Sequence, residues 1–158
     1  VRMAEEFGGA EVDHETYELM IATIRDLLCR FETRHGIRGH LGQGRVQMIG
    51  TSGTVTTIAG IHLGLERYQR DKVDGQLLHF DQIREAVDHL TTLSLADRSA
   101  HPCIGPDRAD LVLPGCAIMD AILREWPVGR LRVADRGLRE GILFNLIAAD
   151  QGRKLATA

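Results

Sequence analysis

The sequence predicts an α/β fold in which neighbouring strands run parallel. Two stretches, QMIGTSGTVTTIAG at 47–60 and RLRVADRGLREGILFNLI at 130–147, each pass from a short apolar strand through a glycine-containing turn into a helix. Helical patterns occupy the sequence between them. Because parallel strands are joined by helical crossovers, this repeated order indicates a parallel arrangement. The predicted strands are few for a freestanding sheet and would leave an edge exposed.

A long amphipathic helix is expected between Asp13 and Gly36. Asp13 suits an N-cap, and Gly36 follows two basic residues as a helix stop. The apolar residues between them recur at three- and four-residue spacing, which is typical of one helix face: Tyr17, Met20, Ile21, Ile24, Leu27, Leu28 and Phe31.

The first strand–turn–helix unit comes next. A glycine-rich loop at 36–44 leads to a predicted strand at 45–49, and the helix after the turn is expected at 54–63, ending near Gly64. Beyond a polar connection, Leu77 and Leu78 are expected to be extended.

Two further helices are expected before the second unit. Asp81 is expected to cap a helix that carries four spaced apolar residues: Ile83, Val87, Leu90 and Leu93. A loop rich in proline and glycine at 100–108 precedes a helix predicted at 107–126. Within that helix, Pro114 and Gly115 are expected to introduce a kink.

Composition indicates a single soluble globular domain. The chain has 158 residues, of which 44% are hydrophobic and 26% charged. Its net charge of −3 argues against a broad DNA-binding or membrane-binding surface. No apolar run approaches the ~20 residues that span a bilayer, and no signal peptide is recognised.

Cysteine and histidine spacing predicts neither disulfides nor a metal site. Cys29, Cys103 and Cys116 are far apart and odd in number, which favours a reducing cytoplasm and buried, unreactive thiols. No two of the seven histidines have the spacing of a helical metal motif. A bound transition metal or structural zinc is therefore not expected.

The turn in IGTSGT, at 49–54, has two readings. It is a plain tight turn, or it is a place where free amides and the positive end of the following helix, around Gly53 and Thr54, meet an anion. It lacks the lysine of a P-loop and the glycine spacing of a dinucleotide fingerprint.

Two later motifs also carry candidate residues. In ADRGLREG, at 134–141, Asp135 is expected to cap the last helix, and Gly137 to allow a left-handed or close-packed turn. Arg136 lies beside them, although ordinary capping and charge pairing explain this motif equally. In GPDRADLVLPG, at 105–115, Arg108 falls in the first turn of a predicted helix, where the dipole disfavours a cation unless an anion lies nearby. It is a phosphate-ligand candidate or a solvated arginine.

Together, IGTSGTVTTIAGI, DRADLVLPGCAIMDAIL and RLRVADRGLREGIL resemble the Ppx/GppA family of exopolyphosphatases and guanosine pentaphosphate phosphohydrolases, from residue 1 to about 147. This resemblance implies an actin-like ATPase (ribonuclease-H-like) fold with two lobes and a phosphate-binding cleft between them. The chain, 1–158, is similar to the second, C-terminal lobe only, truncated at its N-terminal strands. VRMAEEF, at 1–7, resembles a strand and turn of that lobe, and residue 1 is not methionine. The chain is therefore expected to be a fragment.

The resemblance also implies a function. The parent enzyme would hydrolyse terminal phosphoanhydride bonds of polyphosphate or pppGpp, with Mg²⁺ and the catalytic glutamate supplied mainly by the missing parts. The family's phosphate loops are absent here, so this polypeptide alone is expected to be inactive. The positions that match the phosphate-binding cleft are Gly53, Thr54, Arg108, Asp135 and Arg136.

The partners implied by the resemblance are polyphosphate or guanosine penta- or tetraphosphate, the missing first lobe and, in the full-length protein, a second copy in a homodimer. Neither DNA nor a membrane is among them. Two alternatives stay open: a non-catalytic module that binds nucleotide or polyphosphate and regulates a partner, and a relative of the sugar or acetate kinases with the same fold.

Overall fold

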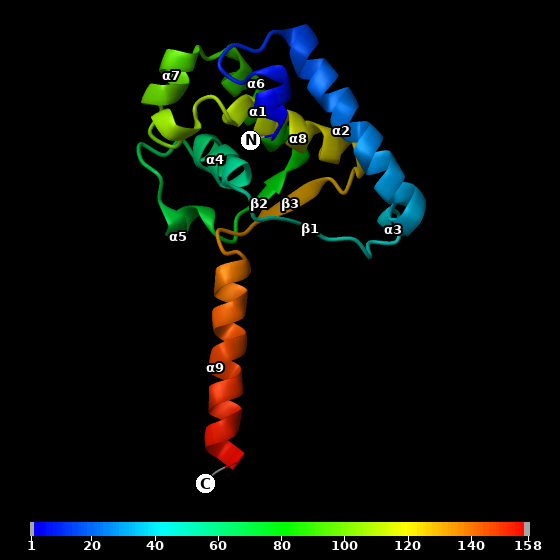
Figure 1. Ribbon diagram of the computed structural model, residues 1–158, viewed down its shortest axis with the longest axis vertical. Helices are drawn as coiled ribbons and strands as arrows, with labels where there is room; N and C mark the ends of the chain where they lie inside the picture. Colours follow the sequence, from blue (N-terminus) through cyan, green and yellow to red (C-terminus); the bar gives the residue numbers. More distant parts are fainter. Residues whose placement is uncertain (1, 157–158) are drawn as a thin grey trace.

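The computed structural model describes residues 2–156. A helical head stands over a small sheet, and the last helix projects away from it (Figure 1). In chain order the elements are α1 (Arg2–Phe7), α2 (His14–His35), α3 (Arg38–Leu41), β1 (Met48–Gly50), α4 (Gly53–His62), α5 (Arg70–Val73), β2 (Leu77–His79), α6 (Phe80–Thr92), α7 (Leu95–Ala100), the 3-10 turn η1 (Pro106–Arg108), α8 (Val112–Glu125), β3 (Arg130–Val133) and α9 (Leu138–Ala156).

The sheet has the strand order β1-β3-β2. β1 and β3 run parallel, with Met48 opposite Leu131, which confirms the parallel arrangement predicted for the two strand–turn–helix units. β2 pairs with the other side of β3 in the antiparallel sense, with Leu78 opposite the same Leu131, so the prediction of parallel neighbours is wrong for this pair. The extended conformation expected at Leu77 and Leu78 is therefore confirmed as an edge strand.

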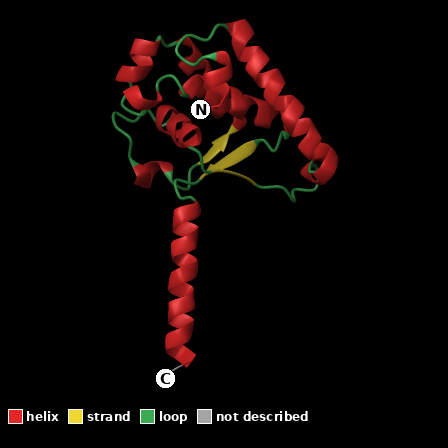
Figure 2. Cartoon of the chain, in the orientation of Figure 1, coloured by secondary structure: helices red, strands yellow, loops and turns green. Residues whose placement is uncertain are grey.

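One face of the sheet packs on the helices and the other is open (Figure 2). On β3 the side chains of Leu131 and Val133 are buried, whereas Arg130 and Arg132 are exposed. Ile49, opposite Arg132 on β1, is 56% exposed. Because alternate strand residues point to opposite faces, this pattern places the hydrophobic core on the helical side alone.

The core lies between the sheet and helices α2, α4, α6 and α8. Its fully buried members include Met20 from α2, Ile58 from α4, Leu90 from α6 and Ala117 from α8. Gly115 brings α8 against α4, because a Cβ at that position would lie 2.2 Å from Thr54 Oγ1. Two helices can approach this closely only where one of them lacks a side chain.

The predicted limits of α2 are confirmed at both ends. Asp13 Oδ1 accepts a hydrogen bond of 2.8 Å from the Thr16 amide, and this bond to the charged form lowers the Asp13 pKa. Gly36 ends the helix with φ 63° in the left-handed conformation. Only the first half of the apolar stripe is buried, since Leu27 and Phe31 remain exposed.

Several predicted elements are shifted or wrong. Residues 2–7 form a helix and not the expected strand and turn. The helix predicted from Asp107 begins at Val112, which leaves Arg108 in the η1 turn before it. Pro114 then falls in the first turn of α8, where backbone amides have no intrahelical acceptor. The proline therefore removes no helical hydrogen bond, and the predicted cause of a kink is absent there. α6 begins at Phe80, which places Asp81 inside its first turn and not at the cap.

A buried arginine joins three distant segments of the head. Arg98 on α7 is 2% exposed, and its Nη1 donates to the carbonyls of Ala109 at 2.8 Å and Gly9 at 3.2 Å. Its Nη2 donates to the carbonyl of Ala10. Gly9 itself leaves no room for a side chain, because a Cβ there would lie 1.8 Å from the Asp110 carbonyl oxygen. The loop after α1 is therefore pinned against the residues that follow η1.

All three cysteines are free thiols. Cys103 and Cys116 are buried, and burial raises the pKa of both. Cys29 is exposed, so the expectation of burial is wrong for that residue. Among the described residues, we find no helix whose length and hydropathy would allow it to cross a bilayer.

Candidate functional site

A cavity of about 250 Å³ opens at the start of α4. Gly53, Thr54 and Thr57 of α4 form one side, Arg108 of η1 another, and Met3 of α1 contributes as well. Ile104, Leu111 and residues of the first two turns of α8 complete the lining. Three of the sequence-predicted site residues, Gly53, Thr54 and Arg108, therefore lie together.

The first turn of α4 lines this cavity, and its first backbone amides have no intrahelical acceptor. Ser52 caps the helix, and its Oγ accepts a hydrogen bond of 3.3 Å from the Val55 amide. The amides of Gly53 and Thr54 precede that bond, in the turn where α-helical geometry supplies no intrahelical acceptor. The positive end of the helix dipole coincides with them.

Arg108 lies directly against this helix end. A Cβ built on Gly53 would be 3.3 Å from Arg108 Nη1, so the glycine provides the space that the guanidinium occupies. Arg108 is exposed, and among residues 2–156 its side chain forms no ion pair or hydrogen bond. An unpaired cation beside a positive helix end is unfavourable without an anion between them.

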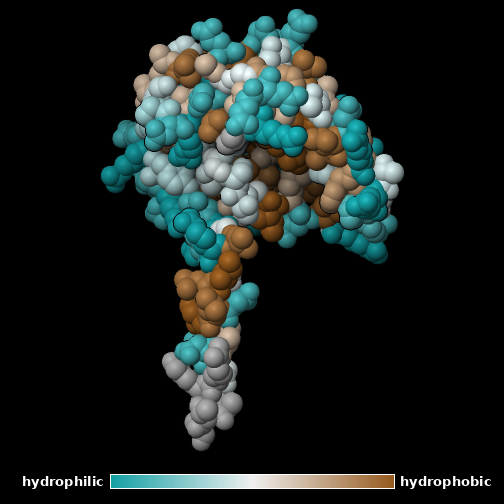
Figure 3. All heavy atoms as spheres, viewed as in Figure 1, coloured by the Kyte–Doolittle hydropathy of each residue, from teal (hydrophilic) through white to brown (hydrophobic). Residues whose placement is uncertain are grey.

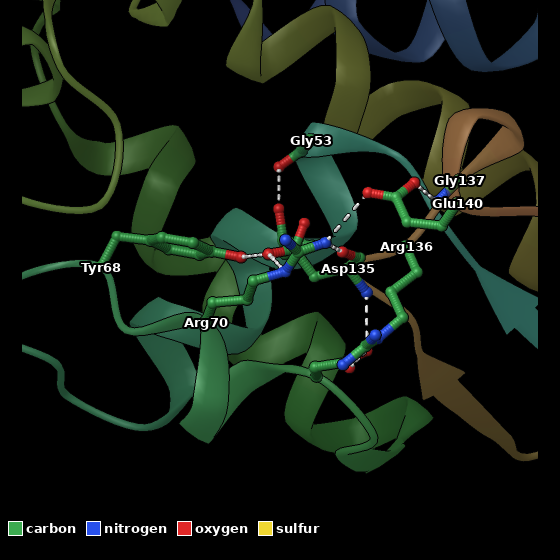
Figure 4. A network of polar contacts seen from close by, with 9 residues as sticks. Gly53, Tyr68, Arg70, Asp135, Arg136, Gly137 and Glu140 are labelled. Carbon is green, nitrogen blue, oxygen red and sulfur yellow. Dashed lines mark hydrogen bonds and ion pairs between the residues drawn. The ribbon is translucent and has the colours of Figure 1, made fainter. Parts of the chain in front are cut away.

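The other two predicted residues, Asp135 and Arg136, belong to a polar cluster between β3 and α9 (Figure 4), in which Gly53 of the cavity is drawn as well. Asp135 Oδ2 accepts 2.7 Å from Tyr68 Oη and pairs with Arg70 Nε at 3.2 Å. Arg136 Nε donates to Asp74 Oδ2 at 3.0 Å. Both charges are thus already paired within the chain, and any anion would have to compete with these partners.

The predicted capping role of Asp135 is wrong. Glu140 on α9 supplies the bond instead, because its Oε2 accepts 2.8 Å from the Gly137 amide. Gly137 has no positive φ and a Cβ there would meet nothing closer than 4.0 Å, so neither a left-handed nor a close-packed turn explains this glycine. Asp135 faces Tyr68 and Arg70, which hold it away from the helix.

The cluster and the cavity meet near the turn that joins β1 to α4. The Ala134 amide donates to the Gly50 carbonyl at 2.9 Å, which fixes the start of the cluster against that turn. Thr51 also lines the small depression formed by Arg70 and Glu140. A substitution at either end of this turn is therefore expected to alter both the cavity and the polar cluster.

Charge pairing shifts the acidic groups of the cluster. The bonds from Arg136 and from the Asp135 amide hold the pKa of Asp74 below its usual range, and the Gly137 amide does the same for Glu140. Both carboxylates therefore favour folding above their ordinary pKa values, and that contribution is lost as the pH falls through the lowered folded-state values.

Tyr68 titration provides a direct test of the cluster. Burial and the hydrogen bond to Asp135 raise the pKa of Tyr68 from 10.0 to about 12, and burial also raises that of Tyr17, the other tyrosine. We expect phenolate absorbance to be absent near pH 10 and to rise near pH 12. The stabilising effect of the protonated Tyr68 is complete below pH 10 and is lost as the pH rises through its folded value.

The matched control is Tyr68→Phe, in which the step near pH 12 disappears while the unfolded protein still titrates Tyr17 near 10. A folded wild-type protein that forms phenolate near pH 10 would contradict the hydrogen bond between Tyr68 and Asp135.

Sequence reasoning missed Tyr68, Arg70 and Asp74. Each lies more than sixty positions from its partner near β3, on a connection that carries no motif. The local signal was the charged turn at 134–141 itself, which holds Asp135 and Arg136 and which ordinary charge pairing explained equally. Thr57 was also missed, because it reads as an ordinary helical residue.

The described residues contain no group of three or more His, Cys, Asp or Glu side chains placed to hold a metal ion. The cavity lining includes two threonine hydroxyls and Arg108 but no carboxylate. Mg²⁺ prefers carboxylate and phosphate oxygens, so this lining does not fit it as a protein-held ion.

Comparisons place these features among known proteins. A sequence model of the Ppx/GppA phosphatase family matches residues 2–149. A putative exopolyphosphatase of Haemophilus influenzae is 27% identical over 105 residues, which cover 65% of this chain and 30% of that protein. The Aquifex aeolicus member of the Ppx/GppA family superposes with TM-score 0.73 at 23% identity, over 94% of this chain and 46% of its own. An exopolyphosphatase from Cytophaga hutchinsonii gives TM-score 0.76 at 20% identity, over 94% and 47%.

These structures confirm the predicted actin-like ATPase (ribonuclease-H-like) fold, in which the small mixed sheet carries helices. The chain spans about half the length of the solved relatives and under a third of the curated one.

Proposed function

This chain belongs to the Ppx/GppA phosphatase family, and on that premise we propose that it forms one wall of a phosphate-binding cleft in a phosphohydrolase. The substrates are inorganic polyphosphate or pppGpp, whose terminal phosphoanhydride bond is cleaved by water. The relatives named as exopolyphosphatases support this substrate class. The other wall belongs to the first lobe of such an enzyme.

The observation that carries the proposal is the unpaired Arg108 guanidinium at the start of α4. Arg108, Gly53 and Thr54 line one cavity, so we expect a phosphate oxygen placed there to meet both the cation and the helix end. A charge-assisted contact of this kind is shorter and stronger than a neutral hydrogen bond. With the phosphate between them, the Arg108 guanidinium and the positive end of α4 no longer repel each other, and both act as ligands.

In hydrolysis, Arg108, Gly53 and Thr54 would hold and orient the phosphate chain and offset its negative charge. None of them is a base, and the cavity lining has no carboxylate that could orient the attacking water. We therefore assign water activation to a glutamate of the first lobe. Asp135 and Arg136 remain proposed neighbours of the phosphate. They are less available to it, because Arg70 and Asp74 already pair with them.

We further propose that Mg²⁺ assists the reaction by neutralising phosphate charge, and that its ligands come mainly from the first lobe and the substrate. The carboxylate-free lining of the cavity supports that division. The same lining is the one feature that favours the alternative function, a regulatory module that binds polyphosphate or nucleotide without cleaving it.

The test is binding by this chain alone. Arg108→Ala is expected to weaken the binding of tripolyphosphate and of pppGpp about tenfold in isothermal titration calorimetry, since the charge-assisted contact is lost. The matched control is Arg84→Ala, because Arg84 is also largely exposed and its Nη1 is 3.9 Å from Asp81 on the surface of α6. Arg108→Lys should restore part of the affinity, as a cation without the planar fork.

Equal dissociation constants for wild type and Arg108→Ala would eliminate the ligand role of Arg108. Phosphate release by the isolated chain above that of a heat-denatured sample would contradict the assignment of water activation to the other lobe. Binding without release is the expected result for this chain, and hydrolysis should then require the first lobe to be added.

A further inference from the structure

The proposed phosphate site is assembled from segments that are far apart in the sequence. Gly53 lies at the start of α4, Arg108 in η1 and Met3 in α1. In Figure 3 the face of the head that carries α1 and α4 is hollowed, and apolar side chains lie inside the hollow. Apolar contacts are not directional, so they do not by themselves fix how these segments are oriented.

Arg108 has no polar side-chain contact that would hold it against α4. Within residues 2–156 its guanidinium makes no ion pair or hydrogen bond, although Nη1 would lie only 3.3 Å from a Cβ on Gly53. The place of this guanidinium therefore depends on how the backbone of η1 is held.

Two hydrogen bonds anchor the backbone on either side of Arg108. Before η1, Thr57 Oγ1 of α4 donates to the Cys103 carbonyl at 3.4 Å. After η1, Nη1 of Arg98 on α7 donates at 2.8 Å to the carbonyl of Ala109, the residue next to Arg108. The second anchor is shorter and nearer in sequence, so we expect it to have the greater control over Arg108.

The Arg98 guanidinium also holds the segment that follows α1. Its Nη1 donates to the Gly9 carbonyl at 3.2 Å, and its Nη2 donates to that of Ala10. These residues connect α1, which contributes Met3 to the cavity, with α2. One side chain therefore orients both the wall formed by α1 and the wall formed by η1.

An arginine at this position carries a desolvation cost. Arg98 is 2% exposed, and burial lowers its pKa. Among the described residues it forms no ion pair, and its Nε has no hydrogen-bond partner. Only a planar fork with several donors reaches the carbonyls of both segments at once. A side chain that served packing alone would need neither the charge nor the fork.

We propose that Arg98 is a positioning residue of the phosphate site, which places Arg108 against the start of α4 by holding the Ala109 carbonyl. Arg98 is not part of the cavity lining, so it acts through Arg108 and not on the phosphate. The proposal rests on the proposed function, because it takes Arg108 as the phosphate ligand. It adds a residue of α7 to those that determine the affinity of the site.

A double-mutant cycle on tripolyphosphate binding by this chain tests the proposal. Arg98→Met should weaken binding about fivefold when Arg108 is present and should have no effect in an Arg108→Ala background, where no guanidinium is left to misplace. Isothermal titration calorimetry is carried out at a temperature at which circular dichroism shows every variant to be folded. Ile21→Ala is the control, because it also destabilises the core while α2 contributes nothing to the cavity lining, so its affinity should be unchanged.

A second measurement needs no ligand. Because the Arg108 guanidinium lies beside Gly53, Arg98→Met should move the Gly53 amide resonance in NMR spectra in the same direction as Arg108→Ala does. Ile21→Ala should leave that resonance in place. Arg98→Lys keeps the charge without the fork, so it should be intermediate in both measurements, and it takes the place of Arg98→Met in the cycle if the methionine variant does not fold.

The positioning role would be overturned by equal affinities of wild type and folded Arg98→Met, or by an effect of Arg98→Met that is as large without Arg108 as with it. An unmoved Gly53 resonance would overturn it without reference to any ligand. Failure of the proposed function gives a different result. The wild type would then bind no tripolyphosphate, or Arg108→Ala would bind it equally well, whatever Arg98→Met does to the Gly53 resonance.

Discussion

Arg98→Met is expected to lower the free energy of unfolding by about 4 kcal/mol, the largest effect of any single substitution proposed here. Methionine fills the volume of the arginine stem but donates no hydrogen bond. The carbonyls of Gly9, Ala10 and Ala109 would then be left buried without their donor. In a domain of this size the melting temperature should fall by about 10 °C.

Thermal and urea unfolding followed by circular dichroism measure this change. Arg84→Met is the control, because Arg84 is largely exposed and its replacement should alter stability by less than about 0.5 kcal/mol. Arg98→Lys should be intermediate, since an ammonium can reach only part of a site shaped for a planar fork. If Arg98→Met unfolds like Arg84→Met, the three carbonyl contacts do not contribute to stability.

Gly115→Ala is expected to lower the free energy of unfolding by about 3 kcal/mol, at the upper end of the cost of overpacking. The added Cβ would lie 2.2 Å from Thr54 Oγ1 and 2.9 Å from its Cγ2, so α4 and α8 must move apart. That movement displaces Thr54 in the candidate phosphate site. Tripolyphosphate binding should therefore weaken together with stability.

A double-mutant cycle tests the cause. Thr54→Ala removes the two nearest atoms, so it should recover part of the stability of Gly115→Ala and give a coupling free energy of about 1 kcal/mol or more. Gly141→Ala is the control, because it lies within exposed α9 with no atom inside 4 Å. Alanine there should stabilise the helix slightly. A Gly115→Ala protein as stable as Gly141→Ala would show that the two helices separate without cost.

Local signals predicted the fold where a helix or strand depends on neighbours in sequence. Asp13 and Gly36 bracket α2 as expected, because capping is decided within four residues. The same reasoning failed at 1–7, since a six-residue helix has little intrinsic stability and forms where the rest of the protein holds it. Arg98 shows no local sign of burial, because its acceptors lie up to 89 positions away.

The part of the candidate site that depends on local sequence was also predicted. Gly53 and Thr54 stand out as a glycine turn before a helix, and the free amides follow from that geometry. Arg108 was singled out for a position in a helical first turn that it does not occupy, yet the contact with Gly53 brings it to a helix end all the same. The pairing of Asp135 with Tyr68 and Arg70 depends on tertiary structure alone, and no spacing rule could reveal it.

The parallel pairing of β1 with β3 has a consequence for how the protein acquires its structure. Met48 meets Leu131, so this pairing closes a loop of about eighty residues, and the entropy of that closure must be overcome before the sheet exists. Among the strands of residues 2–156, β2 and β1 each attach only to β3, so no two of them can pair until β3 has formed. Contacts this distant in sequence slow folding. The helices should therefore gain structure first, and during synthesis the sheet stays open until β3, at Arg130–Val133, has emerged.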